Sequence, residues 1–167
     1  MAQTGLIIAG LSSASGKTFT TLGLLRALKN YGASICAAKT GPDYIDPGFH
    51  EAAVGMASVN LDGYAMDDDL IRHLAAQQEG QTLIIEGVMG LYDGQEGSAL
   101  SLAKILKLPI VLVMDIRGQS ETAGEVATAL KERLAKDHVH IAGIILNRCQ
   151  SERHGMMVAD HCRALGL

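Results

Sequence analysis

Short apolar runs rich in β-branched residues alternate along the chain with longer segments whose apolar residues recur every three or four positions. The short runs predict five strands, at 5–9, 34–39, 82–86, 109–114 and 140–146. The longer segments predict helices at 18–30, 67–78, 98–106, 122–135 and 151–165. Between them, the proline-containing stretch 41–48 and the glycine-rich stretch 87–97 are typical of loops.

The predicted strands are continuous apolar runs rather than alternating ones. Strands of this kind are covered by helices on both faces, which is typical of a parallel sheet. We therefore expect a doubly wound α/β fold with a mainly parallel sheet, in one domain over residues 1–167. In the helix at 122–135, Thr122 and Glu125 have the spacing of a capping box, and Val126, Leu130 and Leu134 share one predicted apolar face.

Composition excludes several classes of protein. The chain is 48% hydrophobic and 19% charged, which excludes a disordered segment. Its net charge is −4 and it has no basic stripe, so no nucleic-acid partner is expected. No apolar run approaches the ~20 residues of a membrane-spanning helix. The three cysteines are odd in number and lack a C-x-x-C pair, which favours the reducing cytoplasm.

The first predicted strand leads into Gly10-Leu-Ser-Ser-Ala-Ser-Gly-Lys-Thr18, and a predicted helix follows. This context is that of a P-loop, in which small residues let backbone N–H groups turn toward a phosphate. Five residues separate the two glycines, where the usual pattern has four. An ordinary strand–turn–helix corner is the alternative. The P-loop interpretation predicts a sheet of the P-loop NTPase type and these nucleotide-binding residues: Gly10, Ser12, Ser13, Ala14, Ser15, Gly16, Lys17 and Thr18.

Carboxylates follow two other predicted strands. Glu86 ends the third strand, where a ligand of Mg²⁺ is expected beside a P-loop, and Asp93 lies in the glycine-rich loop after it. The second strand ends in Lys39, with Asp43 and Asp46 close behind. The two aspartates would need a metal or a cation to balance them. Alternatively, Asp93 is a solvated loop residue, and Gly-Pro-Asp and Asp-Pro-Gly are ordinary turns.

Three stretches give the chain a close resemblance to a known family: GLSSASGKT (10–18), KTGPDYIDPGFH (39–50) and EGVMGLYDG (86–94). They resemble the N-terminal ATP-binding part of the cobyrinic acid a,c-diamide synthases, as do NLDGYAM (60–66) and GIILNR (143–148). This family and the dethiobiotin synthetases share the five-residue spacing in the P-loop. The chain departs from the family pattern at Leu11, usually small and polar, and at Gly63-Tyr64, usually a proline and an aromatic residue.

The resemblance implies an ATP- and Mg²⁺-dependent carbon–nitrogen ligase of the glutamine amidotransferase family, acting in cobalamin biosynthesis. Such an enzyme amidates the a and c carboxylates of cobyrinic or hydrogenobyrinic acid through an acyl phosphate. It also implies the following roles: Lys17, Lys39, Asp43, Asp46 and Asp93 in catalysis; Thr18, Asp46 and Glu86 as metal ligands; Tyr44 and Ile45 in substrate binding; Asn147 and Arg148 in nucleotide binding, at the adenine. Asp115, which closes the fourth strand, receives no role.

The resemblance also implies a source of ammonia, which is a C-terminal glutaminase domain in full-length members of the family. We therefore expect these 167 residues to be the N-terminal part of a longer chain, or the partner of a glutaminase subunit. A homodimer is left open. Alternatives are amidation of a related nickel tetrapyrrole, a dethiobiotin synthetase-like or cobyric acid synthase reaction, and a switch ATPase of the deviant P-loop type. The switch ATPases carry a lysine where this chain has Ser12.

Overall fold

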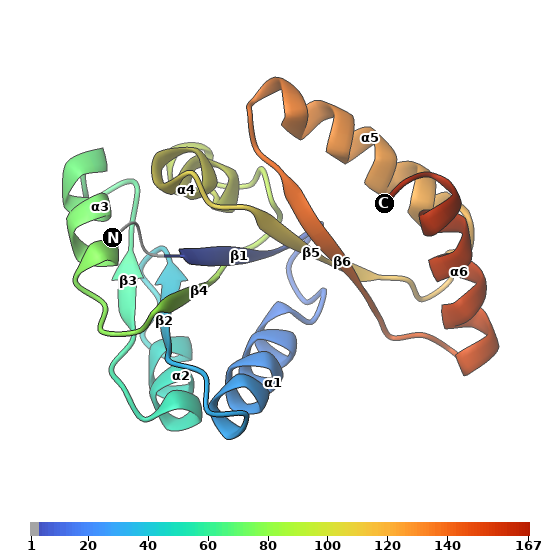
Figure 1. Cartoon of the computed structure of the whole chain (residues 1–167). Coiled ribbons are helices and arrows are strands. Elements are labelled where there is room, and N and C mark those ends of the chain that lie inside the picture. Colours follow the sequence, from blue (N-terminus) through green and yellow to red (C-terminus); the bar gives the residue numbers. More distant parts are fainter. Residues whose placement is uncertain (1–3) are drawn as a thin grey trace.

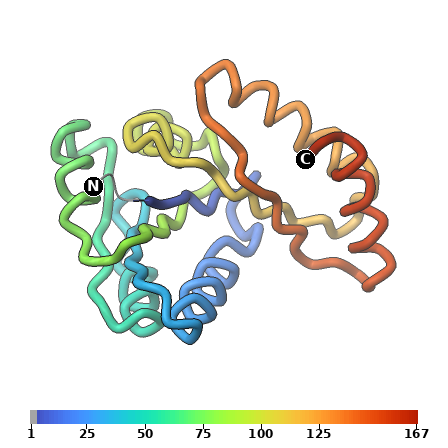
Figure 2. The backbone as a smooth tube through the Cα atoms, in the orientation of Figure 1, coloured from blue at the N-terminus to red at the C-terminus, as the bar shows by residue number. Residues whose placement is uncertain are grey.

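Six parallel strands form one sheet in the computed structural model, which describes residues 4–167 (Figure 1). Their order across the sheet is β3-β2-β4-β1-β5-β6. Their bounds are β1 Thr4–Gly10, β2 Ile35–Thr40, β3 Val59–Leu61, β4 Thr82–Glu86, β5 Ile110–Asp115 and β6 Ile141–Asn147. The expected parallel α/β fold is confirmed, and β1 lies beside β4, which is distant in the sequence (Figure 2).

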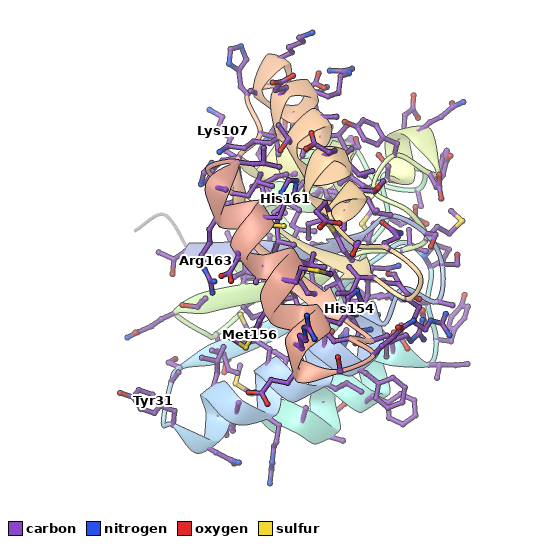
Figure 3. All side chains as sticks on the ribbon, turned by 90° about the vertical axis from the view of Figure 1, so that its right-hand side faces the viewer. Tyr31, Lys107, His154, Met156, His161 and Arg163 are labelled. Atoms are coloured by element: carbon purple, nitrogen blue, oxygen red, sulfur yellow. The ribbon has the colours of Figure 1, made fainter. Side chains whose placement is uncertain are left out.

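Helices cover both faces of this sheet, as the apolar strands require (Figure 1). The helices are α1 Lys17–Asn30, α2 Asp46–Val54, α3 Asp68–Ala76, α4 Ala99–Leu106, α5 Thr122–Lys136 and α6 Glu152–Ala164, with a 3₁₀ turn, η1, at Gln95–Gly97. α1 and α2 pack on one face, around Ile8 and Leu25, while α3 and α4 pack on the other, around Ile7. α6 packs beside α5 at the β6 end of the sheet (Figure 3). None of the described helices is long and apolar enough to cross a membrane.

Two elements were missing from the sequence prediction. The segment 41–48, expected to be a loop, is non-helical only as far as Ile45. Helix α2 begins at Asp46 and ends before Gly55, which has a left-handed conformation. Pro47 occupies the first turn of α2, where a missing N–H and a fixed φ are tolerated, so here proline begins a helix instead of marking a turn. The sixth strand, β3, has only three residues, which is too short for a periodic signal.

The prediction for the start of α5 was also wrong in detail. Thr122 is already helical, and the residue before it, Glu121, makes no side-chain capping bond, so there is no capping box. Val126 is exposed, and the buried face is formed instead by Leu134 with small residues such as Ala127. Small residues are needed there because α6 comes close: a Cβ on Gly124 would lie 2.7 Å from the His161 ring.

Candidate active site

The loop between β1 and α1 has the backbone of an anion-binding loop. Ala14 and Gly16 are both left-handed, with φ of 58° and 99°, and alternating handedness of this kind forms a concavity of N–H groups. A Cβ on Gly10 would collide with the Ser15 hydroxyl, and one on Gly16 would collide with the Asn147 amide. The left-handed φ of Gly16 itself favours glycine, and a side chain at either position would displace a polar group of the loop, which favours a P-loop over an ordinary corner.

Two polar side chains of this loop have little to bind within the protein. Lys17 is buried, and its Nζ donates only to the Ser12 carbonyl among the described residues, at 3.0 Å. Burial, together with the charge of Lys39, lowers the pKa of Lys17. The buried Ser15 hydroxyl has no hydrogen-bond partner within residues 4–167. A bound phosphate would satisfy both groups.

Next to this loop, an ammonium group and two carboxylates converge from different elements. Lys39 and Glu86 are direct neighbours in the β2–β4 ladder, and their Nζ and Oε1 atoms are 2.9 Å apart. Lys39 Nζ also donates to Asp46 Oδ2 at the start of α2, at 2.6 Å. From the start of α1, the Thr18 hydroxyl donates to Glu86 Oε1 at 2.5 Å. The structure thus brings together residues from three separate stretches of the sequence.

The pKa values of the two carboxylates in this cluster, Glu86 and Asp46, are shifted in opposite directions. Burial would raise the pKa of Glu86, but hydrogen bonds from His50, Thr18 and Lys39, with the Lys39 charge, lower it to about 2. For Asp46, burial and the Glu86 charge raise the pKa against the lowering effect of Lys39. The pKa of Lys39 is raised, because its attraction to Glu86 and Asp46 outweighs the cost of burial. Of the two carboxylates, Asp46 is therefore the one whose charged form is less stable in this site.

The cluster fits a magnesium ion that also binds phosphate. Together with Asp43 and Lys17, which lie beside it, the cluster brings three carboxylates (Asp43, Asp46 and Glu86) close to two ammonium groups (Lys17 and Lys39). Among residues 4–167, no three His, Cys, Asp or Glu side chains converge as a metal cage. Magnesium does not need one, since it usually takes one or two carboxylates and completes its shell with phosphate and water. Thr18, Asp46 and Glu86 could hold it in this way.

His50 is part of this cluster and was missed by the sequence analysis. It is fully buried on α2, with Nε2 2.8 Å from Glu86 Oε2 and Nδ1 3.1 Å from the Ser58 hydroxyl. The signal that could have found it is its spacing from Asp46: residues four apart lie on the same side of a helix. That signal was invisible while the segment was taken for a loop.

Asp43 and Asp93 shape the loops around the cluster. Asp43 Oδ1 accepts the backbone N–H groups of Ile45 and Asp46, at 2.8 and 3.0 Å, and Asp43 Oδ2 lies 3.7 Å from Lys39 Nζ. Asp93 Oδ2 accepts the N–H of Gly90 at 2.8 Å. These contacts match the turn-forming alternative, and the catalytic roles of the two aspartates stay predictions.

Two residues expected to bind substrate form an exposed apolar rim beside the cluster. Tyr44 and Ile45 are 94% and 69% exposed, beside the start of α2. Large apolar side chains left in water at one edge favour contact with a ligand. Their role in substrate binding stays a prediction.

The end of β6 holds the P-loop in place. Asn147 Nδ2 donates to the Ser15 carbonyl at 2.9 Å, and Arg148 donates to the Ala14 carbonyl at 2.7 Å. Asp115, for which the sequence suggested no role, binds Arg148 at 2.6 Å and also pairs with Arg117. These bonds give Asn147 and Arg148 a part in shaping the loop, while their contact with adenine stays a prediction.

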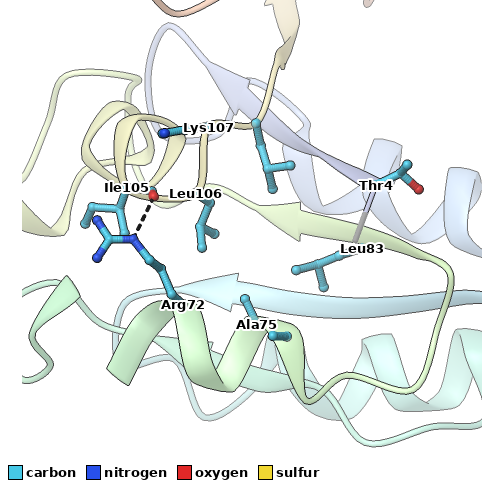
Figure 4. A pocket seen from close by; sticks show the side chains of 9 residues that line it. Thr4, Arg72, Ala75, Leu83, Ile105, Leu106 and Lys107 are labelled. Atoms are coloured by element: carbon cyan, nitrogen blue, oxygen red, sulfur yellow. Dashed lines mark hydrogen bonds between the residues drawn. The ribbon is translucent and has the colours of Figure 1, made fainter. Parts of the chain in front are cut away.

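One apolar cavity lies away from this chemistry. It measures about 420 Å³ and opens between α3 and α4, at the amino ends of β1 and β4 (Figure 4). Arg72 at its edge is already bound to Asp68, Asp69 and the Ile105 carbonyl. Ligands of open α/β sheets bind at the carboxyl ends of strands, so this cavity is on the wrong side for a nucleotide.

Glu86 should make the stability of the protein depend on pH. Its pKa is depressed from 4.5 to about 2, so its contribution is complete above pH 4.5 and declines as the pH falls toward 2. At neutral pH, Glu86→Gln should lower the free energy of unfolding by about 3 kcal/mol, because it leaves buried donors without a charged partner. Urea denaturation of both proteins in metal-free buffer, between about pH 6 and pH 3, should show the gap narrowing with acid. If the difference in unfolding free energy between the two proteins did not change with pH, the lowered pKa of Glu86 would be contradicted.

Comparisons with known proteins identify the family of this chain and support its fold. Residues 6–166 match the family model described as CobQ/CobB/MinD/ParA nucleotide binding domain. The whole chain is 46% identical to hydrogenobyrinate a,c-diamide synthase of Mesorhizobium japonicum, and 98% of it is 47% identical to that of Rhodobacter capsulatus. It spans 39% of the length of each of these relatives. Among solved structures, cell division protein FtsY of Thermotoga maritima aligns with 99% of this chain and 59% of its own, with a TM-score of 0.64 and 16% identity, a likeness of fold.

Proposed function

The chain belongs to the CobQ/CobB/MinD/ParA nucleotide-binding domain family, and from that premise we propose that it uses ATP and Mg²⁺ to amidate the a and c carboxylates of a corrinoid. Hydrogenobyrinic or cobyrinic acid is the proposed substrate. The names of the two diamide synthases support this choice, as both are similar to this chain over nearly its whole length.

The proposed reaction has two steps. A substrate carboxylate oxygen attacks the γ-phosphorus of ATP, the bond to the bridging oxygen breaks, and ADP leaves with an acyl phosphate formed. Ammonia then attacks the acyl carbon, the nitrogen loses a proton, and phosphate leaves. Phosphorylation is needed because a free carboxylate would have to expel an oxide. Transfer of the phosphoryl group depends mainly on positioning and on neutralising charge.

The residues of the site suit these tasks. Lys17 and the P-loop backbone would bind the phosphates, and the unpaired Ser15 hydroxyl would donate to one of them. Thr18, Asp46 and Glu86 would hold Mg²⁺, which neutralises charge on the phosphates when bound. Lys39 adds a positive charge beside them, and Tyr44 and Ile45 offer the exposed apolar rim that a macrocycle could contact.

One observation carries the proposal: beside a P-loop lysine, hydrogen bonds of 2.5–2.9 Å link Thr18 to Glu86, Glu86 to Lys39 and Lys39 to Asp46. An ordinary structural corner would not assemble a buried cluster with more carboxylates than cations at its phosphate-binding end. The deviant P-loop switch is disfavoured, because Ser12 offers its carbonyl to Lys17 where such ATPases have a second lysine.

Mass spectrometry of candidate macrocycles tests the function. With ATP, Mg²⁺ and ammonia, hydrogenobyrinic or cobyrinic acid should be converted to a diamide, whereas a nickel tetrapyrrole should not react. Glutamine should not replace ammonia, since we propose that ammonia is supplied by a glutaminase domain or subunit outside these 167 residues. Omitting ATP is the control. If only the nickel tetrapyrrole were converted, the proposal of a corrinoid substrate would be wrong. If this chain used glutamine, the proposed source of ammonia would be wrong.

A further inference from the structure

Helix α2 directs two side chains into the cluster from one face, one turn apart. Asp46 binds Lys39, and His50 binds Glu86. Glu86 is fully buried, and its two oxygens have separate partners: Oε1 faces Thr18 and Lys39, while Oε2 faces only His50 among the described residues. The imidazole therefore binds the carboxylate oxygen that Thr18 and Lys39 leave free.

The ring of His50 is fixed at both nitrogens. The ionised Glu86 carboxylate can only accept a hydrogen bond, so Nε2 of His50 must carry a proton and donate it. The other nitrogen, Nδ1, lies 3.1 Å from the Ser58 hydroxyl in the connection between α2 and β3. A hydroxyl can donate or accept, so this second contact holds the ring whatever its charge. Ser58, His50 and Glu86 thus form a chain of hydrogen bonds that ends at a proposed metal ligand.

We propose that His50, held by Ser58, is a positioning residue that fixes the Glu86 carboxylate so that Oε1 is presented beside Thr18 for a divalent cation. The proposal rests on the proposed function, since it concerns the same site. His50 touches neither nucleotide nor substrate in this scheme. Partners of this kind orient metal-binding carboxylates, and their loss typically lowers metal affinity by about 10–100-fold.

A purely structural His50 would have a different signature. It would stabilise the fold by occupying a buried space and by satisfying Glu86, but a folded variant would bind metal normally. A positioning residue affects metal binding in protein that is still folded. The two roles are separated by measuring the affinity for metal, in addition to stability and activity.

A pair of amide variants tests which contact of His50 matters. The amide nitrogen of glutamine reaches about as far along the side chain as Nε2, and that of asparagine about as far as Nδ1. His50→Gln therefore keeps a donor for Glu86, whereas His50→Asn keeps only the contact with Ser58. Binding of Mn²⁺ in the presence of ADP is followed by electron paramagnetic resonance, ADP binding without metal by calorimetry, and folding by thermal denaturation.

We expect His50→Asn to weaken Mn²⁺ binding by about 10–100-fold and His50→Gln to weaken it by less than about threefold. Metal-free ADP binding should change little in both. Ser58→Ala frees the imidazole ring but leaves its donor to Glu86, so it should weaken Mn²⁺ binding measurably, though by less than His50→Asn does. It is the deciding variant if His50→Asn does not fold. Equal Mn²⁺ affinity in wild type and His50→Asn, or in wild type and Ser58→Ala, would overturn the proposal. Wild-type protein that binds ADP but no Mn²⁺ would overturn the metal site of the proposed function as well.

Discussion

Replacing Lys17 with methionine is expected to lower kcat/KM for ATP-dependent amidation by at least about a hundredfold, because the variant lacks the charge that stabilises the transferring phosphoryl group. Methionine matches lysine in length and in helix propensity, so the change removes charge with little effect on packing. Turnover is measured with a corrinoid, ATP, Mg²⁺ and ammonia. Retained turnover would show that this loop is not the phosphate site.

The same variant should be at least as stable as the wild type. Lys17 is the first residue of α1, where the helix dipole disfavours a cation, and burial lowers its pKa, so its charge is unfavourable in the folded protein. Removing the charge should therefore leave the free energy of unfolding unchanged or raise it by some tenths of a kcal/mol. A residue retained against stability in this way is typical of a functional site.

Lys29 is the matched control, because it lies in the last turn of the same helix, where a cation is favoured. Lys29→Met should keep full activity and lose about 0.3–1 kcal/mol of stability. The two variants thus change stability in opposite directions, and only Lys17→Met should lose activity. Equal activity losses in both would mean that damage to α1, rather than to phosphate binding, is being measured.

Asp46→Asn is expected to reduce Mg²⁺-dependent turnover by at least about a hundredfold while the protein stays folded. Asparagine keeps the size of the side chain and an oxygen at the start of α2, but it lacks the negative charge proposed to hold the metal. The measurement is turnover as a function of Mg²⁺ concentration. Rates like those of the wild type at all concentrations would make Asp46 structural.

The free energy of unfolding should distinguish the roles of Asp46 and Glu86. The pKa of Asp46 is raised because burial and the Glu86 charge outweigh the attraction of Lys39, so Asp46→Asn should lower the free energy of unfolding at neutral pH by less than Glu86→Gln does. Glu86→Gln should lower it, as argued above, although both variants lose turnover. Asp68→Asn is the control, since Asp68 is likewise the first residue of a helix but pairs with Arg72 at the surface. It should leave turnover unchanged.

Much of the fold followed from local patterns. The apolar runs gave five of the six described strands within one or two residues at their ends, and Asp67 and Ser98 cap α3 and α4 close to the expected starts. The errors arose where one sequence pattern is compatible with two local structures. Asp-Pro-Gly forms turns and also begins helices, and only packing of α2 against α1 and β2 decided between them. Apolar Val126 was predicted to be buried because the periodic pattern takes no account of small residues. In the structure, small Ala127 is buried instead, where α5 packs closely against α6.

The sequence by itself determined a parallel α/β sheet with a glycine-rich loop and a GKT helix start, because both signals come from residues close together in the chain. It also identified Lys39, Asp46 and Glu86 as candidates. Only the tertiary structure decided that they share one cluster with Thr18, that Glu86 is strongly acidic while Asp46 is not, and that His50 belongs with them. The physical reason is that a carboxylate's pKa depends on burial and on which donors surround it, and here those donors come from α1, β2 and α2.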